Sequence, residues 1–139
     1  MNIDDCWQSS NRAKSGEIEE DRDRFPSGIR SLSDYIHSKG LKFGIYSSAG
    51  YVSTFTAPLH KVLILILVVD NDFWYICRFK TCQGFPASLG LEYEDVKTYA
   101  SWGVDYLKYD NCYTDHGSPQ SRYLEMAAAI QTVTAAEVL

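Results

Sequence analysis

The chain has 139 residues, of which 45% are hydrophobic and 22% charged, which is typical of one globular domain with a single core. The net charge of −5 and the lack of a lysine- or arginine-rich stripe argue against nucleic-acid binding. The three histidines and four cysteines show no metal-ligand spacing. We therefore expect neither a metal ion nor a cofactor.

Cysteine usage and the N-terminal residues bear on the cellular compartment. Cys6, Cys77, Cys82 and Cys112 could form disulfides if the protein is secreted. The stretch Met1–Asp5 is polar and does not resemble a signal peptide. The residues alone therefore indicate either a cytosolic protein or a sequence that lacks its true N-terminus.

The N-terminal stretch Asn2–Trp7 predicts the end of a strand that runs into a loop. Asp4 and Asp5 lie side by side there, before an aromatic residue. They favour either the rim of a polar pocket or a plain solvated turn. Residues 8–23 carry many charges of both signs and predict a surface loop.

A helix and a strand follow in residues 28–50. After Gly28, apolar residues recur at helical spacing, namely Ile29, Leu32 and Ile36. Gly40 is the expected C-cap of this helix. Leu41–Tyr46 is the next predicted strand, and the small residues 47–50 form a loop at its carboxyl end. The order strand, helix, strand favours parallel pairing.

The pattern is interrupted after residue 50. Leu63–Val69 is entirely apolar, yet it is much shorter than the roughly 20 residues that a membrane span needs. We therefore expect no membrane association. The run is consistent with a buried strand, and it is also an aggregation-prone window.

The regular pattern returns after a Gly- and Pro-containing loop at 81–90. One helix is indicated by Tyr93, Val96, Tyr99 and Ala100, and a last one by Tyr123, Met126, Ala127 and Ile130. A strand at 104–110 lies between them. The order of elements predicts an α/β protein, either a fragment of a (β/α)8 barrel or a doubly wound sheet. No Gly-rich phosphate-binding motif supports the second alternative.

The strand Tyr106–Asp110 has two different faces. Leu107 and Tyr109 point to one side, and Lys108 and Asp110 point to the other. A cation and a carboxylate are costly in a dry core unless they are paired. The pattern fits either an open strand end that meets a polar ligand or an exposed edge strand with a surface Lys–Asp pair.

Four motifs in the right order resemble the α-galactosidases of glycoside hydrolase family 27, particularly those of fungal type; the motifs are Asn2–Trp7, Phe43–Gly50, Thr81–Pro86 and Tyr106–Cys112. The resemblance implies a retaining glycosidase with a (β/α)8 TIM barrel, of which this chain would supply about the second to fourth βα units. It implies an extracellular enzyme that hydrolyses terminal α-linked galactose from oligosaccharides, galactomannans or glycoconjugates. An α-N-acetylgalactosaminidase and a non-catalytic truncated remnant are the alternatives.

The resemblance also assigns roles to residues. Asp110 would be the nucleophile, and Lys108 would contact the sugar. Asp4 and Asp5 would accept hydrogen bonds from galactose hydroxyls, and Tyr46 would line the sugar site. A retaining enzyme also needs a second carboxyl group roughly 5–5.5 Å from the nucleophile. The family places that acid/base on a later strand, beyond Leu139, so we expect this chain alone to hydrolyse little or nothing.

The resemblance pairs Cys82 with Cys112 in a disulfide next to the nucleophile. It pairs Cys6 with a cysteine upstream of this sequence, in line with a first barrel strand and secretion signal that have no counterpart here. The resemblance assigns no role to Cys77, because this cysteine lies in a segment that does not resemble the family's sequences.

That segment, residues 52–79, interrupts an otherwise continuous match over residues 2 to about 131. Joining Tyr51 to Lys80 gives the sequence Ala-Gly-Tyr-Lys-Thr-Cys-Gln-Gly, which resembles the uninterrupted motif of the family. Our hypothesis is that the segment is a translated, unspliced intron; the alternative is a genuine loop insertion. We therefore interpret residues 1–139 as one partial catalytic domain with a foreign interruption.

Overall fold

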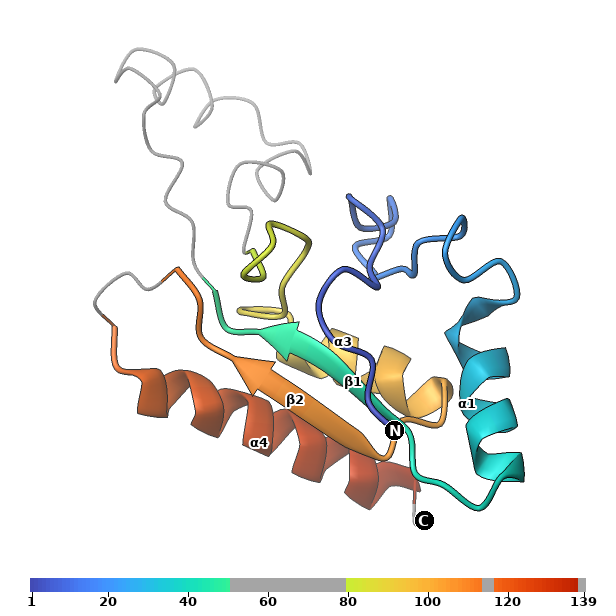
Figure 1. The fold of residues 1–139 in the computed structure, drawn as a ribbon. Helices are drawn as coiled ribbons and strands as arrows, with labels where there is room; N and C mark the ends of the chain where they lie inside the picture. The colour runs from blue at the N-terminus through green and yellow to red at the C-terminus, as the bar shows by residue number, and fades with distance from the viewer. Residues whose placement is uncertain (51–79, 114–116, 138–139) are drawn as a thin grey trace.

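A computed structural model describes residues 1–50, 80–113 and 117–137 (Figure 1). Its elements are α1 (Gly28–Ser38), β1 (Gly44–Ser48), α3 (Glu92–Ser101), β2 (Tyr106–Asp110) and α4 (Pro119–Glu137). The apolar run Leu63–Val69 and most of the proposed foreign segment, including Cys77, lie outside the described residues.

The two strands lie side by side in parallel, as the order of elements predicts. Tyr46 pairs with Lys108, and Ser48 pairs with Asp110. On the other side of β1, Asn2 forms a parallel bridge with Gly44. Three consecutive chain segments are therefore parallel neighbours in sequence order, with helices between them, which is how successive βα units of a barrel are arranged.

Both strands begin later than the sequence pattern predicts, at Gly44 instead of 41 and at Tyr106 instead of 104. Leu41 is exposed, and the Asp105 carboxylate accepts the Phe43 backbone N–H at 2.9 Å, which takes the place of a ladder hydrogen bond. β1 also continues through Ser47 and Ser48, which the sequence pattern predicts in the loop. Both side chains are fully buried, and both residues form hydrogen bonds with Ser88 in the neighbouring loop.

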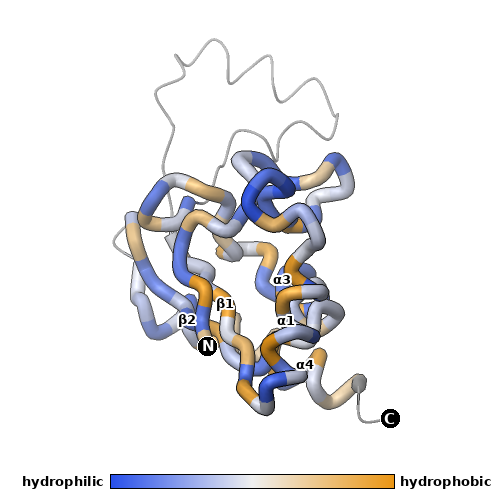
Figure 2. The backbone as a smooth tube through the Cα atoms, turned by 45° about the vertical axis from the view of Figure 1, so that its right-hand side comes forward, coloured by the Kyte–Doolittle hydropathy of each residue, from blue (hydrophilic) through white to orange (hydrophobic). Residues whose placement is uncertain are grey.

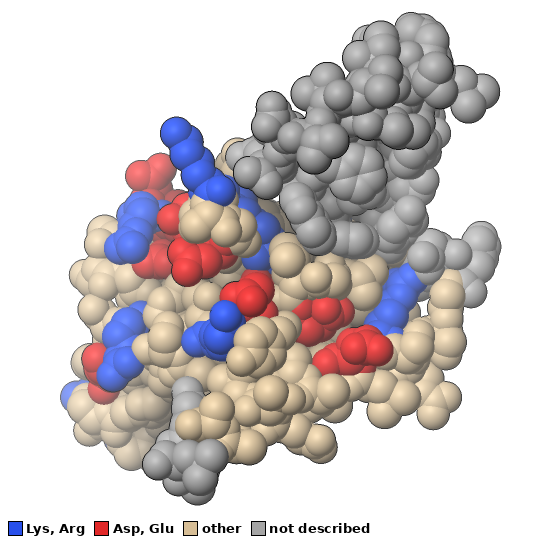
Figure 3. Space-filling view, turned by 180° about the vertical axis from the view of Figure 1, so that it is seen from behind, with Lys and Arg blue, Asp and Glu red and all other residues tan. Residues whose placement is uncertain are grey.

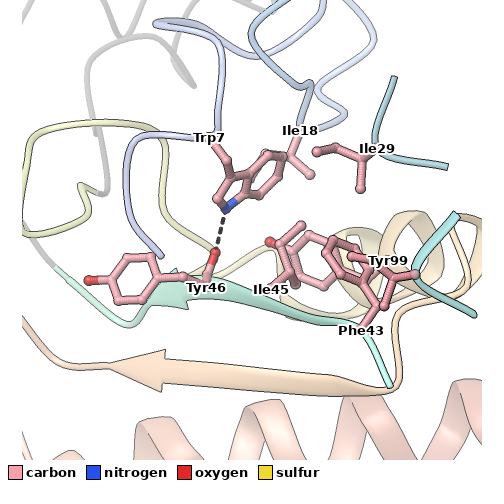
Figure 4. Packing of buried hydrophobic residues seen from close by; sticks show 8 residues of the cluster. Trp7, Ile18, Ile29, Phe43, Ile45, Tyr46 and Tyr99 are labelled. Carbon is pink, nitrogen blue, oxygen red and sulfur yellow. Dashed lines mark hydrogen bonds between the residues drawn. The ribbon is translucent and has the colours of Figure 1, made fainter. Parts of the chain in front are cut away.

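The main core lies between β1, α1 and α3. Ile29, Ile45 and Tyr99 are buried there, and Trp7 packs edge-to-face against Tyr99 with the ring centroids 6.1 Å apart (Figure 4). The hydrophobic parts of the tube gather along β1 and the helices beside it (Figure 2). A second, smaller cluster joins α3 and α4 to the side of β2 that carries Leu107 and Tyr109, as the alternation along β2 predicts.

Residues 8–23 form a loop that is mostly exposed, as predicted, but a few of its residues are buried. Ile18 is 1% exposed and belongs to the core, and Gln8 pairs with Glu20 in an antiparallel bridge. Arg12 binds the buried Asp95 of α3 through two hydrogen bonds of 2.6 Å. These few buried contacts hold a mainly polar segment on the core, and a charge count does not show them.

The predicted apolar faces of the last two helices are only partly right. α4 buries Arg122, Met126, Ala129 and Val133, whereas Tyr123 and Ile130 are exposed. In α3, Val96 and Tyr99 are buried but Tyr93 is exposed. The buried residues of α3 and α4 pack on the two clusters, and Tyr93, Tyr123 and Ile130 lie on the sides of the helices that face away from them.

A polar cluster ties the amino ends of the strands to α1. Asp105 accepts hydrogen bonds from Lys42 and His37 at 2.7 Å each, in addition to that from Phe43 N. The Lys42 hydrogen bond, the backbone N–H and His37 hold the pKa of the Asp105 carboxyl far below its usual range. The carboxylate therefore stabilises the fold above the unfolded-state pKa of about 4, and this contribution is lost as the pH falls through the folded-state value.

We expect Asp105→Asn to lower the free energy of unfolding at pH 7 by about 1–2 kcal/mol, because hydrogen bonds to a charged group are lost. The variant should also lose much of the decline in stability below pH 4. Urea denaturation at pH 7 and pH 3 measures both effects. Asp34→Asn is the matched control, because its salt bridge with Arg30 on α1 is exposed. An equal loss in both variants would contradict the assignment.

Candidate active site

The carboxyl ends of the parallel segments meet at one edge of the sheet, where barrel enzymes build their active sites. Asp4 and Asp5 follow the N-terminal segment, and Asp110 is the last residue of β2. Tyr46 and Lys108 are paired in register on the same side of the sheet as Asp110. All five side chains predicted for the sugar site therefore belong to one end of the structure.

Lys108 connects two of these residues. Its Nζ binds Asp4 Oδ2 at 2.7 Å and lies 5.2 Å from the centre of the Tyr46 ring. The hydrogen bond with Asp4 raises the pKa of Lys108, and the hydrogen bond from Lys108 lowers the pKa of Asp4. The alternative of a surface pair between Lys108 and Asp110 is wrong, because the lysine reaches across to the N-terminal segment.

Asp5 is held by backbone groups. Its Oδ1 accepts the Cys6 N–H at 2.8 Å, and its Oδ2 accepts the Gln83 N–H at 2.9 Å. The second hydrogen bond comes from the loop after β1. Asp5 therefore joins two loops, and it is not part of a plain solvated turn.

Asp110 is half-buried and fixed from both sides. Its backbone carbonyl accepts the Ala49 N–H at 2.7 Å, and its Oδ1 accepts the Asn111 N–H at 2.8 Å. Its Oδ2 lies 3.4 Å from Cys82 Sγ, which carries no proton because it is part of a disulfide. One carboxylate oxygen is thus anchored by the backbone, and the other is left for a reacting group.

The predicted disulfide between Cys82 and Cys112 is present, with the two Cα atoms 5.1 Å apart. It closes a loop with a sequence separation of 30, for which the chain-entropy model gives roughly 3–4 kcal/mol of stabilisation. The Tyr113 hydroxyl donates to the Cys82 carbonyl at 3.0 Å. The bridge therefore holds the loop after β1 against the residues that follow Asp110.

Tyr46 is neutral at ordinary pH. Burial, followed by the negative charges of Asp5 and Asp110, raises the pKa of its phenol to about 12. Its hydroxyl can therefore donate, and it lies 3.1 Å from Cys82 Sγ. The Trp7 indole N–H binds the Tyr46 carbonyl at 2.7 Å and fixes the strand at this point (Figure 4).

Sequence reasoning missed Arg122 in the first turn of α4. Its side chain is buried, and its Nη1 donates to Ala49 O at 3.0 Å and to Asn111 Oδ1 at 2.9 Å. A single arginine among the polar residues that begin a helix does not indicate, from the local sequence, that it is buried at a site. Only the packing of α4 against the strands brings it to the site.

Within the described residues, the one close grouping of potential metal ligands is Cys82, Asp110 and Cys112. Two of its three members are joined in the disulfide, so they offer no thiolate to a metal ion. The described helices include none that is long and apolar enough to cross a bilayer.

A family profile decides the membership of the chain. The family described as Melibiase_2, Alpha galactosidase A, matches residues 1–62 and 72–138. The chain belongs to this family. The Melibiase_2 match runs past residue 131, where the motif resemblance was expected to end, and it also covers part of the segment 52–79.

Individual α-galactosidases are similar to this chain in sequence and in structure. The chain is 44% identical to alpha-galactosidase 2 of Arabidopsis thaliana over 131 residues, which is 94% of this chain and 26% of that protein. Alpha-galactosidase I from Mortierella vinacea is 41% identical and superposes with a TM-score of 0.71, over 94% of this chain and 27% of that one. The α-galactosidase of Saccharomyces cerevisiae, determined with raffinose, is 34% identical over 94% of this chain and 24% of that one, with a TM-score of 0.69.

The chain thus spans about a quarter of the length of the relatives that it matches. The relatives are named α-galactosidases, and their barrel fold accounts for the parallel βα units of this α/β fragment.

Proposed function

We propose that this chain supplies the nucleophile and part of the galactose site of a retaining α-galactosidase that hydrolyses terminal α-linked galactose. One observation carries the proposal. Asp4, Asp5, Tyr46 and Lys108 come from three separate chain segments and lie with Asp110 at one end of the parallel strands. Family membership supports the reaction, and this geometry supports the choice of residues.

In the proposed reaction Asp110 Oδ2 attacks C1 of galactose. The new C1–O bond forms as the bond from C1 to the leaving oxygen breaks, and a water molecule then hydrolyses the galactosyl ester. Asp4 and Asp5 accept hydrogen bonds from galactose hydroxyls. Charge-assisted hydrogen bonds of this kind discriminate strongly between hydroxyl orientations.

A retaining enzyme also needs a proton donor for the leaving oxygen. Asp4 does not suit this role, because the hydrogen bond from Lys108 lowers its pKa and keeps it ionised. Both oxygens of Asp5 accept backbone N–H groups, so the geometry uses them as hydrogen-bond acceptors. We propose that the donor is a carboxyl group of the enzyme outside the described residues.

We propose an α-galactoside carbohydrate as the substrate and an extracellular location for the enzyme. The disulfide beside Asp110 supports an oxidising compartment. Nucleic acid is not a proposed partner, because positive and negative side chains are interspersed on the face seen in Figure 3 and the net charge is −5.

The test is equilibrium binding of sugars to the purified chain. We expect D-galactose to bind and D-glucose, its C4 epimer, to bind much more weakly. Asp4→Asn should weaken galactose binding about 10- to 100-fold, because one charge-assisted hydrogen bond is worth roughly 1.5–3 kcal/mol. Glu94→Gln, which removes an exposed carboxylate paired with Lys97 on α3, should have no effect.

Three other results would overturn parts of this proposal. Equal binding of galactose and glucose would contradict the role of Asp4 and Asp5. Tighter binding of N-acetylgalactosamine than of galactose would indicate an α-N-acetylgalactosaminidase. Binding of none of these sugars would indicate a non-catalytic remnant.

A further inference from the structure

Two backbone N–H groups hold Asp110, one through its main-chain carbonyl and one through its carboxylate. Ala49 N–H holds the Asp110 carbonyl, and Asn111 N–H holds Oδ1. Ala49 lies just beyond β1, and Asn111 lies just beyond β2. The paired register ends at Ser48 and Asp110, and beyond it Ala49 is joined to β2 by the hydrogen bond from its N–H to Asp110 O.

Arg122 contacts both of them. One nitrogen, Nη1, donates to the carbonyl of Ala49 at 3.0 Å and to Oδ1 of Asn111 at 2.9 Å. The residue is 6% exposed, so its charge is largely shielded from water and its hydrogen bonds are stronger than they would be at the surface. A guanidinium group is rigid and permanently charged, which suits it to hold two acceptors in one geometry.

We propose that Arg122 is a positioning residue for the nucleophile. It holds Ala49 and Asn111, and through them it orients the Asp110 carboxylate with Oδ1 anchored and Oδ2 free to react. This inference rests on the proposed function of Asp110, but it concerns a residue that does not itself touch the sugar. Its effect should appear in the rate of attack and not in the affinity for galactose, because an error of about 1 Å in the position of a reacting atom can cost roughly 100-fold in rate.

The disulfide does not make Arg122 redundant. Cys112 is bonded to Cys82 in the loop after β1, so it restrains Asn111 from one side only. Arg122 reaches the same stretch from α4 and joins it to the end of β1. Asn111 therefore has two independent supports, and only one of them also holds Ala49.

The experiment uses the whole chain and 2,4-dinitrophenyl α-D-galactoside, whose leaving group departs as a phenolate without protonation. Asp110 forms a bond to C1 as the bond to the phenolate oxygen breaks, so dinitrophenolate absorbance follows the first turnover. We expect Arg122→Met to slow this step roughly 10- to 100-fold, with an unchanged dissociation constant for galactose. Arg122→Lys should be intermediate, because an ammonium group keeps the charge and loses the planar fork.

Arg12→Lys is the matched control. Arg12 is also a buried arginine, but it binds Asp95 and Ala87 O away from Asp110. We expect it to lower the thermal midpoint and leave the first-turnover rate constant of the folded molecules unchanged. If Arg122→Met does not fold, the first-turnover rate constants of Arg122→Lys and Arg12→Lys are compared instead, and only the first should be lowered.

The outcomes separate the two proposals. If the unaltered chain binds galactose and releases dinitrophenolate, but the Arg122 variants react at the same rate, the positioning role is wrong and the proposed function stands. An equal slowing in Arg12→Lys would show general loosening and would also overturn the positioning role. If the unaltered chain neither binds galactose nor reacts, the proposed function is wrong, and this inference is wrong with it.

Discussion

Asp110→Asn is expected to abolish release of dinitrophenolate from 2,4-dinitrophenyl α-D-galactoside and to leave the fold intact. An amide of the same size can still accept the Asn111 N–H that Oδ1 accepts now, at 2.8 Å. It cannot attack C1, because a neutral amide oxygen is a far poorer nucleophile than a carboxylate. Mass spectrometry should show one galactosyl group on the unaltered chain, localised to the peptide that contains Asp110, and none on the variant.

Asp105→Asn is the control for this experiment. Asp105 lies near the opposite, amino end of the same strand and binds Lys42 and His37. Under conditions where this variant is folded, it should be labelled like the unaltered chain. Labelling of the Asp110→Asn variant at the normal rate would show that another residue is the nucleophile.

Removal of residues 52–79 is expected to stabilise the chain. The two described residues that flank the interruption already meet, since Lys80 N–H donates to Gly50 O at 3.2 Å. In the shortened chain only Tyr51 would separate them, which makes this hydrogen bond that of a three-residue γ-turn. Loop-closure entropy for about 30 residues then favours the short connection by roughly 2–3 kcal/mol.

Gly50 is well suited to this close junction. A Cβ atom added there would lie 1.9 Å from Lys80 O and 2.5 Å from Cys112 O. The backbone at Gly50 is therefore packed directly against that of Lys80 and of Cys112. These contacts join described residues on both sides of the interruption.

Urea denaturation of the deletion variant measures the gain in stability, and light scattering measures aggregation. Aggregation should fall because the apolar run Leu63–Val69 is removed. A variant that replaces 52–79 by a Gly/Ser linker of equal length separates the effect of loop length from that of composition. Loss of stability or of the Cys82–Cys112 bridge on deletion would identify the segment as a genuine loop insertion. A mature transcript that keeps its codons in most copies would rule out a retained intron.

The local patterns of the chain were sufficient for the order and type of α1, β1, α3, β2 and α4, whereas the N-terminal segment that was predicted to end a strand forms only one bridge, through Asn2. Helical spacing placed α1 and α3 within a residue or two of their bounds, and alternation along β2 separated Leu107 from Lys108 correctly. The errors occur where a tertiary contact replaces a regular one. β1 begins late because Asp105 takes the place of a ladder partner, and the loop 8–23 is held on the core where Arg12 binds Asp95.

For the site, the sequence determined which residues are present and which belong to strand ends, because motif spacing and the period of a strand are local properties. The tertiary structure decided which of them touch. Lys108 pairs with Asp4, 104 residues away, and not with Asp110 on its own strand face. Arg122 joins the site only because α4 packs beside β2. Charge pairing and burial depend on distances between segments far apart in the chain, and no local pattern encodes those distances.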